Sequence, residues 1–357
     1  MRGVVFKGNK HVDVMSFDDP EPGPGEAIVR IKASGMCGSD LPFYRSESPA
    51  RFLVSLGFKS FEERGLAPDT PIIAGHEPCG VIEAIGPGSD RRRFKPGDRV
   101  IVYHYEGCGL CDSCRGGWTQ MCDEGVQSHG AVLHGGHAHF QRVPLSCLVR
   151  LPDEISFAGG AAIACGTGTA FGAIRRLALS AQDVLAVFGL GPVGLSAVQL
   201  AAAMGIEVIG IDIDPRRVAR AKSFGAAHAI DATRRDPVDT VKSLTKGKGA
   251  SAAIDCAGGG VAQQHAVRCT APWGRVALVA GVGHLDVLAW QDVIKAQRTI
   301  IGSYTFSIMG MSACATFIAD RGVEVDRIFT DRWSLEDAAA AYDAFDQMAS
   351  GKGVFVF

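Results

Sequence analysis

The spacing of apolar positions changes near residue 160. Before that point, short apolar runs at 27–31, 80–85 and 99–102 are separated by turns rich in glycine and proline, which is typical of antiparallel β structure. After it, strand-like runs alternate with helix-like runs, beginning at 184–188 and 195–204. This alternation is typical of a parallel α/β sheet, so the pattern predicts two domains of different construction.

Composition excludes several classes of protein. The chain has 357 residues, 47% hydrophobic and 21% charged, which is enough apolar material for real cores and too much for wholesale disorder. A net charge of -2 supplies no global field for nucleic acid or an anionic membrane. Charge interrupts the N-terminus too early for a signal peptide, so we expect a soluble, cytoplasmic protein without nucleic-acid or membrane partners.

One charge-free stretch, residues 184–206, is long enough to span a bilayer. It is broken by Gly189, Gly191, Pro192 and Gly194, and it divides into a β-like half and a helix-like half. The sequence therefore favours a buried strand, a turn and a helix.

Eleven cysteines, an odd number, argue against a disulfide framework. Four of them fall within fifteen residues, at spacings that let four thiolates close a tetrahedron around zinc with no open position. This set predicts a structural zinc site at Cys108, Cys111, Cys114 and Cys122. A nucleic-acid-binding zinc ribbon is disfavoured because Arg115 is the one basic residue in the loop, while an iron–sulfur cluster stays chemically possible.

Residues 189–194 match the pattern G-x-G-x-x-G between a predicted strand and a predicted helix. The glycines allow a tight turn, a close approach of backbone to a pyrophosphate and close helix–strand packing. Asp212 ends the next strand, eighteen residues after Gly194, where its carboxylate suits ribose hydroxyls and repels a 2′-phosphate. NAD is therefore preferred, although Arg216 and Arg217 keep NADP open. The cofactor residues predicted here are Gly189, Gly191, Pro192, Val193, Gly194, Asp212 and Arg217.

Three dispersed segments complete a pattern: Cys37 before Gly38-Ser39-Asp40, the pair His76-Glu77, and Cys165. Together with the two motifs above, and with the spacing from Gly75 through Gly80 and Gly86 to Ser89, the chain resembles the zinc-dependent medium-chain alcohol and polyol dehydrogenases over nearly its whole length. The resemblance implies an α/β protein with a GroES-like catalytic domain (1–160 and 300–357, two zinc sites) and a Rossmann NAD-binding domain with a doubly wound parallel sheet (161–299).

The resemblance also implies a role for each matching residue. Cys37, His76 and Cys165 would be the catalytic zinc ligands, and Glu77 would be an exchanging or outer ligand. Asp40 would orient His76, and Ser39 would hydrogen-bond the substrate oxygen. Thr169, Gly258 and Val282 would border the nicotinamide, and Lys352 would reach the pyrophosphate.

Two features depart from the family pattern. Pro42 stands where many relatives have a relay histidine, so the route of proton exit is left without a named residue. The 38 residues between Cys37 and His76 form an unusually long connection, and the extra segment at about 46–70 is either a helix that shapes the substrate cleft or a surface elaboration. The histidines at 129, 134, 137 and 139 are assigned to structure.

These observations predict a zinc- and NAD-dependent dehydrogenase that oxidises an alcohol, a secondary alcohol or polyol, to the carbonyl by reversible hydride transfer. One alternative is a zinc-free, NADPH-dependent enone or quinone reductase. Another is a non-catalytic nucleotide- or zinc-binding protein. The resemblance further implies a homodimer or homotetramer.

Overall fold

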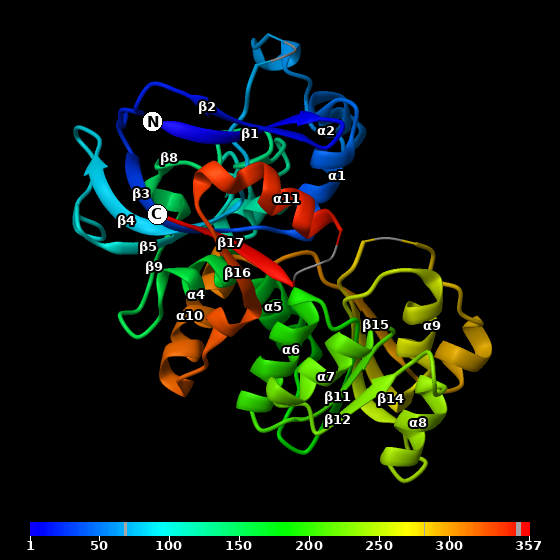
Figure 1. The fold of residues 1–357 in the computed structure, drawn as a ribbon. Helices are drawn as coiled ribbons and strands as arrows, with labels where there is room; N and C mark the ends of the chain where they lie inside the picture. Colours follow the sequence, from blue (N-terminus) through cyan, green and yellow to red (C-terminus); the bar gives the residue numbers. More distant parts are fainter. Residues whose placement is uncertain (68–69, 282, 348–350) are drawn as a thin grey trace. The chain divides into compact units, whose positions relative to one another are not determined.

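A computed structural model describes residues 1–67, 70–281, 283–347 and 351–357. The chain forms two compact units (Figure 1). One comprises Met1–Cys165 together with Ser307–Phe357, and the other comprises Gly166–Phe306. The divisions therefore fall at 165/166 and 306/307, beside the boundaries of about 160 and 300 expected from the sequence.

The first unit is built on a seven-stranded sheet in the order β16-β17-β3-β4-β5-β9, with β8 also pairing with β3. Neighbouring strands are antiparallel except β16 and β17, which are parallel. Because β17 pairs with β3, the end of the chain lies beside the strand that leads into Cys37. The strands are β3 (Glu26–Gly35), β4 (Glu77–Ile85), β5 (Arg99–Val102), β8 (Phe140–Pro144), β9 (Leu148–Arg150), β16 (Phe329–Trp333) and β17 (Lys352–Val356).

Two smaller strand pairs and several helices complete this unit. The strand pairs are β1 (Arg2–Gly8) with β2 (His11–Ser16), and β6 (Tyr105–Glu106) with β7 (Gln127–Ser128). The helices are α1 (Leu41–Arg45), α2 (Pro49–Ser55), α3 (Asp112–Arg115), α4 (Phe157–Ala162), α10 (Ile308–Arg321) and α11 (Ala338–Asp346).

Helix α11 buries one face in a cluster shared with the start of the chain. Ala338, Ala341, Tyr342 and Phe345 recur at helical spacing and pack with residues that include Met36. The C-terminal segment is thus fixed both by a strand pairing and by a helix face.

The segment at 46–70 forms helix α2 and a 3-10 turn at Glu62–Arg64, apart from Pro68 and Asp69, which lie outside the described residues. It has a small core of its own, in which Leu53 and Phe61 pack with Val132. The extra segment therefore contains a helix, and whether that helix shapes the substrate cleft or is a surface elaboration stays a prediction.

The second unit is a six-stranded parallel sheet in the order β12-β11-β10-β13-β14-β15. Numbered from β10 this order is 3-2-1-4-5-6, the doubly wound order of dinucleotide-binding domains. The strands are β10 (Val184–Phe188), β11 (Glu207–Asp212), β12 (His228–Asp231), β13 (Ala250–Asp255), β14 (Thr270–Leu278) and β15 (Thr299–Gly302). The helices are α5 (Gly168–Leu177), α6 (Pro192–Ala203), α7 (Pro215–Ser223), α8 (Pro237–Leu244) and α9 (Gly260–Arg268). The two sheets confirm the predicted fold class.

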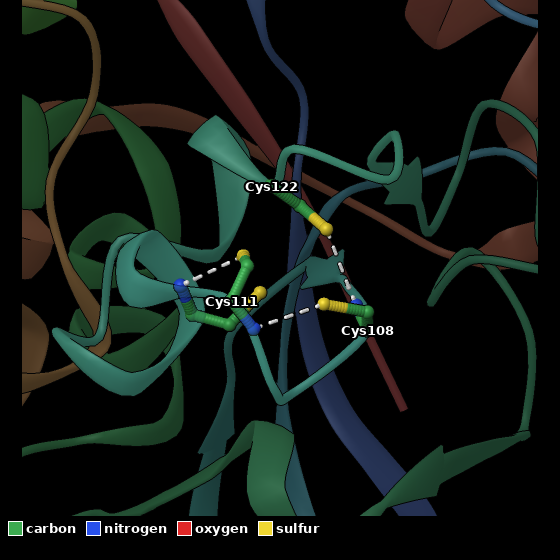
Figure 2. A group of neighbouring side chains, drawn as sticks. Cys108, Cys111 and Cys122 are labelled. Carbon is green, nitrogen blue, oxygen red and sulfur yellow. Dashed lines mark hydrogen bonds between the residues drawn. The ribbon is translucent and has the colours of Figure 1, made fainter.

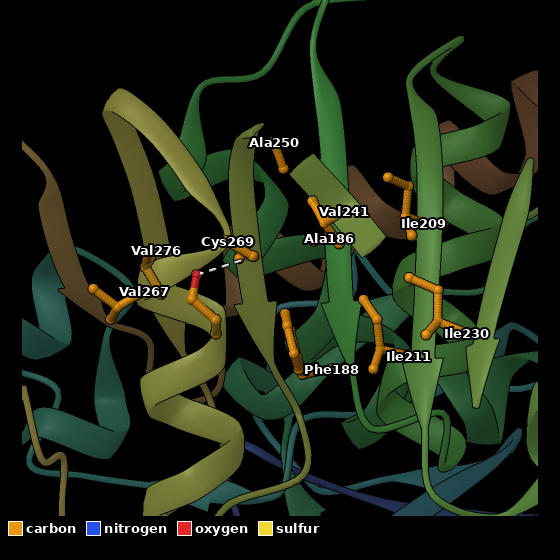
Figure 3. Close-up of a cluster of buried hydrophobic side chains, with 12 residues drawn as sticks. Ala186, Phe188, Ile209, Ile211, Ile230, Val241, Ala250, Val267, Cys269 and Val276 are labelled. Carbon is orange, nitrogen blue, oxygen red and sulfur yellow. Dashed lines mark hydrogen bonds between the residues drawn. The ribbon is translucent and has the colours of Figure 1, made fainter. Parts of the chain in front are cut away.

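The central strands of this sheet are mostly apolar, as expected for strands with helices on both faces, and β10 is apolar along its whole length. Figure 3 shows part of the resulting core, a single buried cluster that includes Phe188, Ile209 and Ile211 from the strands together with Val241 and Val267 from the helices. Two helices begin at aspartate caps, since Asp214 accepts a hydrogen bond from Arg216 N and Asp236 accepts one from Asp239 N.

The charge-free stretch 184–206 forms β10, a glycine turn and α6, as the sequence predicted. Among the described residues, one helical run is long and apolar enough to cross a membrane, Phe157–Leu177. Because 83% of its apolar window is buried inside the fold, the run has the character of a core helix.

We predict that Gly194→Ala destabilises the second unit. A Cβ at Gly194 would stand 1.7 Å from the carbonyl oxygen of Gly189, a backbone atom that has no room to yield. The free energy of unfolding, measured in urea by circular dichroism, should fall by about 1–3 kcal/mol.

Gly191→Ala is the matched control, because a Cβ there meets nothing within 4 Å and φ is -69°. Its stability should stay within about 0.5 kcal/mol of the parent. Equal stability of the two variants would contradict the packing argument.

Candidate functional site

The first site is a cluster of four potential ligands in the unit that holds both chain ends. Cys37 follows β3, His76 and Glu77 lie at the start of β4, and Cys165 lies in a π-helical turn after α4. One donor atom from each residue lies within 4.8 Å of the donor atoms of the others. The fold therefore brings together four predicted residues that are up to 128 positions apart.

The donor set fits zinc. Sγ of Cys37 and Sγ of Cys165 are 3.9 Å apart. This is far longer than a disulfide, whose sulfurs lie about 2.05 Å apart. It is close to the roughly 3.8 Å between two sulfurs that each lie about 2.3 Å from one tetrahedral zinc ion. The hydrogen bond with Cys165 lowers the pKa of Cys37, and His76 lowers it further.

Asp40 and Ser39 lie on the two sides of the His76 ring. Asp40 Oδ1 is 3.0 Å from His76 Nδ1, and Asp40 Oδ2 accepts a hydrogen bond from Cys37 N at 2.8 Å. His76 Nε2 is thereby turned toward the cysteines, and the exposed Ser39 places its Oγ 3.3 Å from that nitrogen. These are the positions that the predicted roles require.

The second site is the four-cysteine loop (Figure 2). The four sulfur atoms lie within 4.8 Å of one another. Backbone amides point at them: Cys108 N donates to Cys122 Sγ at 3.3 Å, and Cys111 N donates to Cys108 Sγ at 3.3 Å. The amides of Cys111 and Leu110 lower the pKa of Cys108 to about 7. Four converging thiols leave no place for a substrate ligand, so the loop fits a structural metal.

The third site is a pocket of about 530 Å³ in the second unit. It lies at the carboxyl ends of β10, β11 and β13, next to the point where the strand order reverses, which is where such sheets bind nucleotides. Its lining includes five residues predicted from the sequence: Gly189, Gly191, Asp212, Arg217 and Gly258.

Other predicted cofactor residues lie elsewhere. Pro192, Val193 and Gly194 begin helix α6, and Thr169 is buried in α5; in the described part of the chain none of them lines this pocket. Val282 lies outside the described residues.

The pocket also has lining residues that the sequence reasoning missed, among them Gly259 and Gly260 at the start of α9 and His265 further along that helix. The sequence did contain a signal for these residues, the glycine run that follows the buried strand ending at Asp255. It repeats the strand–glycine–helix arrangement of the G-x-G-x-x-G segment at 189–194.

Asp212 is 6% exposed, and two backbone amides hold its carboxylate. Leu190 N donates to Oδ2 at 2.6 Å and Asp214 N donates to Oδ1 at 2.8 Å. Arg217 Nη1 lies 3.9 Å from the same group, while Arg216 pairs with Asp214. A fixed carboxylate therefore stands at the end of β11.

Comparison with known proteins supports this reading. Residues 23–153 match the alcohol dehydrogenase GroES-like domain, and residues 192–320 match the zinc-binding dehydrogenase domain. The chain is 38% identical over 359 residues to the uncharacterized zinc-type alcohol dehydrogenase-like protein YphC of Escherichia coli, covering 99% of this chain and 96% of that protein. It is 27% identical to sorbitol dehydrogenase of Bacillus subtilis, over 96% of this chain and 93% of the relative.

A solved structure, alcohol dehydrogenase TADH from Thermus sp. ATN1, superimposes with a TM-score of 0.86 at 29% identity, covering 100% of this chain and 99% of that one. The chain belongs to the zinc-type alcohol dehydrogenase family. It is therefore an oxidoreductase of the medium-chain dehydrogenase type.

Lys352 corrects one expectation for this dehydrogenase. Its Nζ lies 2.6 Å from Glu77 Oε2, donates to Glu77 Oε1 at 2.8 Å, and donates to Met36 O at 2.8 Å. Both side chains of the ion pair are buried. The ammonium group of Lys352 binds Glu77 and a backbone carbonyl next to the first cluster. These contacts do not support the predicted role of Lys352 at the pyrophosphate.

The ion pair also bears on Glu77 as a ligand. Burial acts to raise the pKa of Glu77, and the nearby ammonium of Lys352 acts to lower it. Since both carboxylate oxygens face the ammonium, the carboxylate is held by Lys352 while the two cysteines and His76 remain as donors.

Pro42 cannot take the place of the relay histidine that many relatives have at this position. It is exposed at the start of α1 and has neither a titratable side chain nor a backbone N–H. The prediction that proton exit uses another route stands.

We predict that Lys352→Met in the metal-free dehydrogenase lowers the free energy of unfolding by about 3–5 kcal/mol, because it leaves a buried carboxylate without its partner. Urea unfolding of the chelator-treated protein measures the change. The double variant with Glu77→Gln removes the stranded charge and should recover at least half of the loss. A double variant as unstable as Lys352→Met would show that packing, not charge, is responsible.

Proposed function

We propose that this protein is a zinc- and NAD-dependent dehydrogenase that oxidises a secondary alcohol or polyol to the carbonyl compound, reversibly, by hydride transfer to the nicotinamide. The observation that carries the proposal is the convergence of Cys37, His76 and Cys165 on one point, with the hydroxyl of Ser39 exposed beside it. This arrangement combines a three-donor site with a group suited to bind a substrate oxygen.

Cys37, His76 and Cys165 would hold the catalytic zinc, and three protein donors leave one position for substrate. Zinc bound there would favour loss of the alcohol proton and would polarise the carbonyl in the reverse direction. Ser39 would hydrogen-bond the substrate oxygen and pass on its proton. Asp40 would keep the proton of His76 on Nδ1, so that Nε2 stays available as a donor.

The cysteine loop would hold a second zinc ion, giving two per chain. Its four sulfurs and inward-pointing amides suit a closed tetrahedral site. An iron–sulfur cluster is the chemical alternative. The family match to zinc-binding dehydrogenases supports zinc.

NAD is favoured over NADP by charge. The carboxylate of Asp212, held by two backbone amides, would accept hydrogen bonds from the ribose hydroxyls and repel a 2′-phosphate. Arg216, the cation that would favour the phosphate, donates from Nη2 to Asp214 at 2.8 Å.

Relatives support the substrate class. One is named for sorbitol and another for alcohols, and both match nearly the whole chain. The zinc-free enone reductase is disfavoured because it does not need the convergence of Cys37, His76 and Cys165. A purely binding role is disfavoured by the open zinc position and by Ser39.

The decisive experiment follows nicotinamide reduction by zinc-loaded protein with primary alcohols, secondary alcohols and polyols, using NAD⁺ and NADP⁺ in parallel. We expect turnover with NAD⁺ on a secondary alcohol or polyol. Enone reduction by NADPH in metal-free protein would support the reductase instead. Silence across the panel would favour the non-catalytic role.

Cys165→Ala should retain fold and NAD affinity and lose turnover by more than about 100-fold, beyond the loss typical of changes around a metal ligand. Cys314→Ala, a buried thiol in α10 outside both cysteine clusters, is the control and should keep its activity. Steady-state rates and fluorescence titration of NADH measure the two properties. Normal turnover of Cys165→Ala would remove Cys165 from the ligand set.

We also propose a cytoplasmic homo-oligomer. The second unit exposes large apolar side chains around β14 and β15: Trp273 is 73% exposed and Trp290 is 61% exposed, with Leu288 and Ile294 also exposed. Strand β15 ends the described sheet and so offers an edge for pairing with a second copy. Trp290→Glu should shift the mass measured by sedimentation velocity to that of a smaller species, and a monomeric parent would contradict the proposal.

A further inference from the structure

A continuous network of buried hydrogen bonds runs from His76 through four side chains that lie outside the cluster of potential ligands. Asp40 Oδ1 is 3.0 Å from His76 Nδ1, and the hydroxyl of Tyr342 donates to Asp40 Oδ2 at 3.0 Å. His137 Nε2 is 2.8 Å from that hydroxyl, and the hydroxyl of Ser34 is 2.7 Å from His137 Nδ1. The chain joins residues from four distant parts of the sequence within one unit.

The chemistry of these groups fixes which one donates and which one accepts in each hydrogen bond of the network. An ionised Asp40 only accepts, so Tyr342 must donate to it and must itself accept from His137 Nε2–H. His137 Nδ1 then carries the lone pair, which accepts the hydrogen bond from the hydroxyl of Ser34. Burial lowers the pKa of His137 to about 4, so the ring is neutral and can fill both roles. Every donor therefore points toward Asp40.

The chain is closed to water and tightly packed. Ser34, His137 and Tyr342 are 0% exposed, and Asp40 is 3% exposed. The ring of Tyr342 packs edge-on against Phe6, with centroids 4.8 Å apart. Such a network is rigid when fully satisfied, and every lost bond strands a buried polar group.

His137 also lies against the backbone that leads into His76. A Cβ on Gly75 would stand 2.3 Å from His137 Nδ1, and the φ of Gly75 is +91°, a conformation suited to glycine. The His137 imidazole thus packs against the backbone turn that comes directly before His76. Through Tyr342, its hydrogen bonds also lead to Asp40, the carboxylate that contacts His76.

We propose that Tyr342 and His137 are positioning residues for the metal centre: they hold Asp40 in the conformation that orients His76 and thereby set the affinity of the Cys37–His76–Cys165 cluster for zinc. The proposal rests on the function proposed above. Asp40 Oδ2 accepts hydrogen bonds from both Cys37 N and the Tyr342 hydroxyl. Without the Tyr342 hydroxyl, this oxygen keeps the bond from the nearby Cys37 amide and loses the bond that ties it to helix α11. His137, assigned to structure on sequence grounds, then has a role at the site.

Tyr342→Phe tests the proposal because it keeps the ring and removes one oxygen. The zinc dissociation constant, measured by competition with a chelating dye, should rise about tenfold at this cluster, the lower end of the range for groups that orient metal ligands. Zinc in the four-cysteine loop is an internal reference and should not change. Tyr44→Phe is the matched control, since its ring lies 5.7 Å from that of Tyr342 and its hydroxyl takes no part in the chain.

The second arm varies His137. His137→Gln keeps an amide donor for Tyr342 and should retain more zinc affinity than His137→Phe, which has none. Cobalt substitution adds a readout independent of turnover, because altered geometry at the cluster would move its d–d absorption bands in Tyr342→Phe and leave them in place in Tyr44→Phe.

The outcomes separate the two proposals. If the parent binds no zinc that depends on Cys165, the proposed function fails. If the parent binds that zinc and Tyr342→Phe binds it equally well with the same cobalt spectrum, the positioning role fails. A general loss of stability would affect the four-cysteine zinc as well, and that result would also overturn the specific role.

Discussion

The first unit depends on one constraint. Two thiols, an imidazole and a carboxylate lie within 4.8 Å of one another in a largely buried site. Negative charge in such surroundings is costly unless a cation or a donor faces it. Lys352 forms an ion pair with Glu77. Asp40 accepts hydrogen bonds from Cys37 N and Tyr342 and contacts His76 Nδ1. The protein thus balances the charges of the cluster's surroundings and leaves the thiols and His76 Nε2 for the metal.

The elements that supply these partners explain why the first unit needs both ends of the chain. Strand β17 carries Lys352 and pairs with β3, so the ammonium reaches Glu77 across the sheet. Helix α11 carries Tyr342 into the core shared with β1 and β2. The second unit is inserted between the ligands and these supporting groups along the sequence, yet it is not needed to satisfy their hydrogen bonds.

Local motifs were readable from the sequence because their chemistry is contained in short spacings. The cysteine loop and the glycine turn with Asp212 lie where the pattern placed them. The contact of Asp40 with His76 is one that the family resemblance implied. Lys352 was misjudged because its partner depends on the register of β17 against β3, which no local pattern encodes. His137 was undervalued for the same reason, since its link to Asp40 passes through a residue 205 positions away. Thr169, a position carried over from the family resemblance, is buried in α5 and is not part of the described lining of the nucleotide pocket, so its place beside the nicotinamide stays a prediction.

The order of the first unit along the chain has a consequence for biosynthesis. A ribosome delivers Cys37, His76 and Cys165 before the second unit, and it delivers Tyr342 and Lys352 only after that unit. Until they arrive, Glu77 lacks its counter-ion and Asp40 lacks one of its donors. A nascent chain that has not yet reached these residues would therefore present the ligands without the groups that order them, and the metal centre would mature only after strand β17 had joined the sheet.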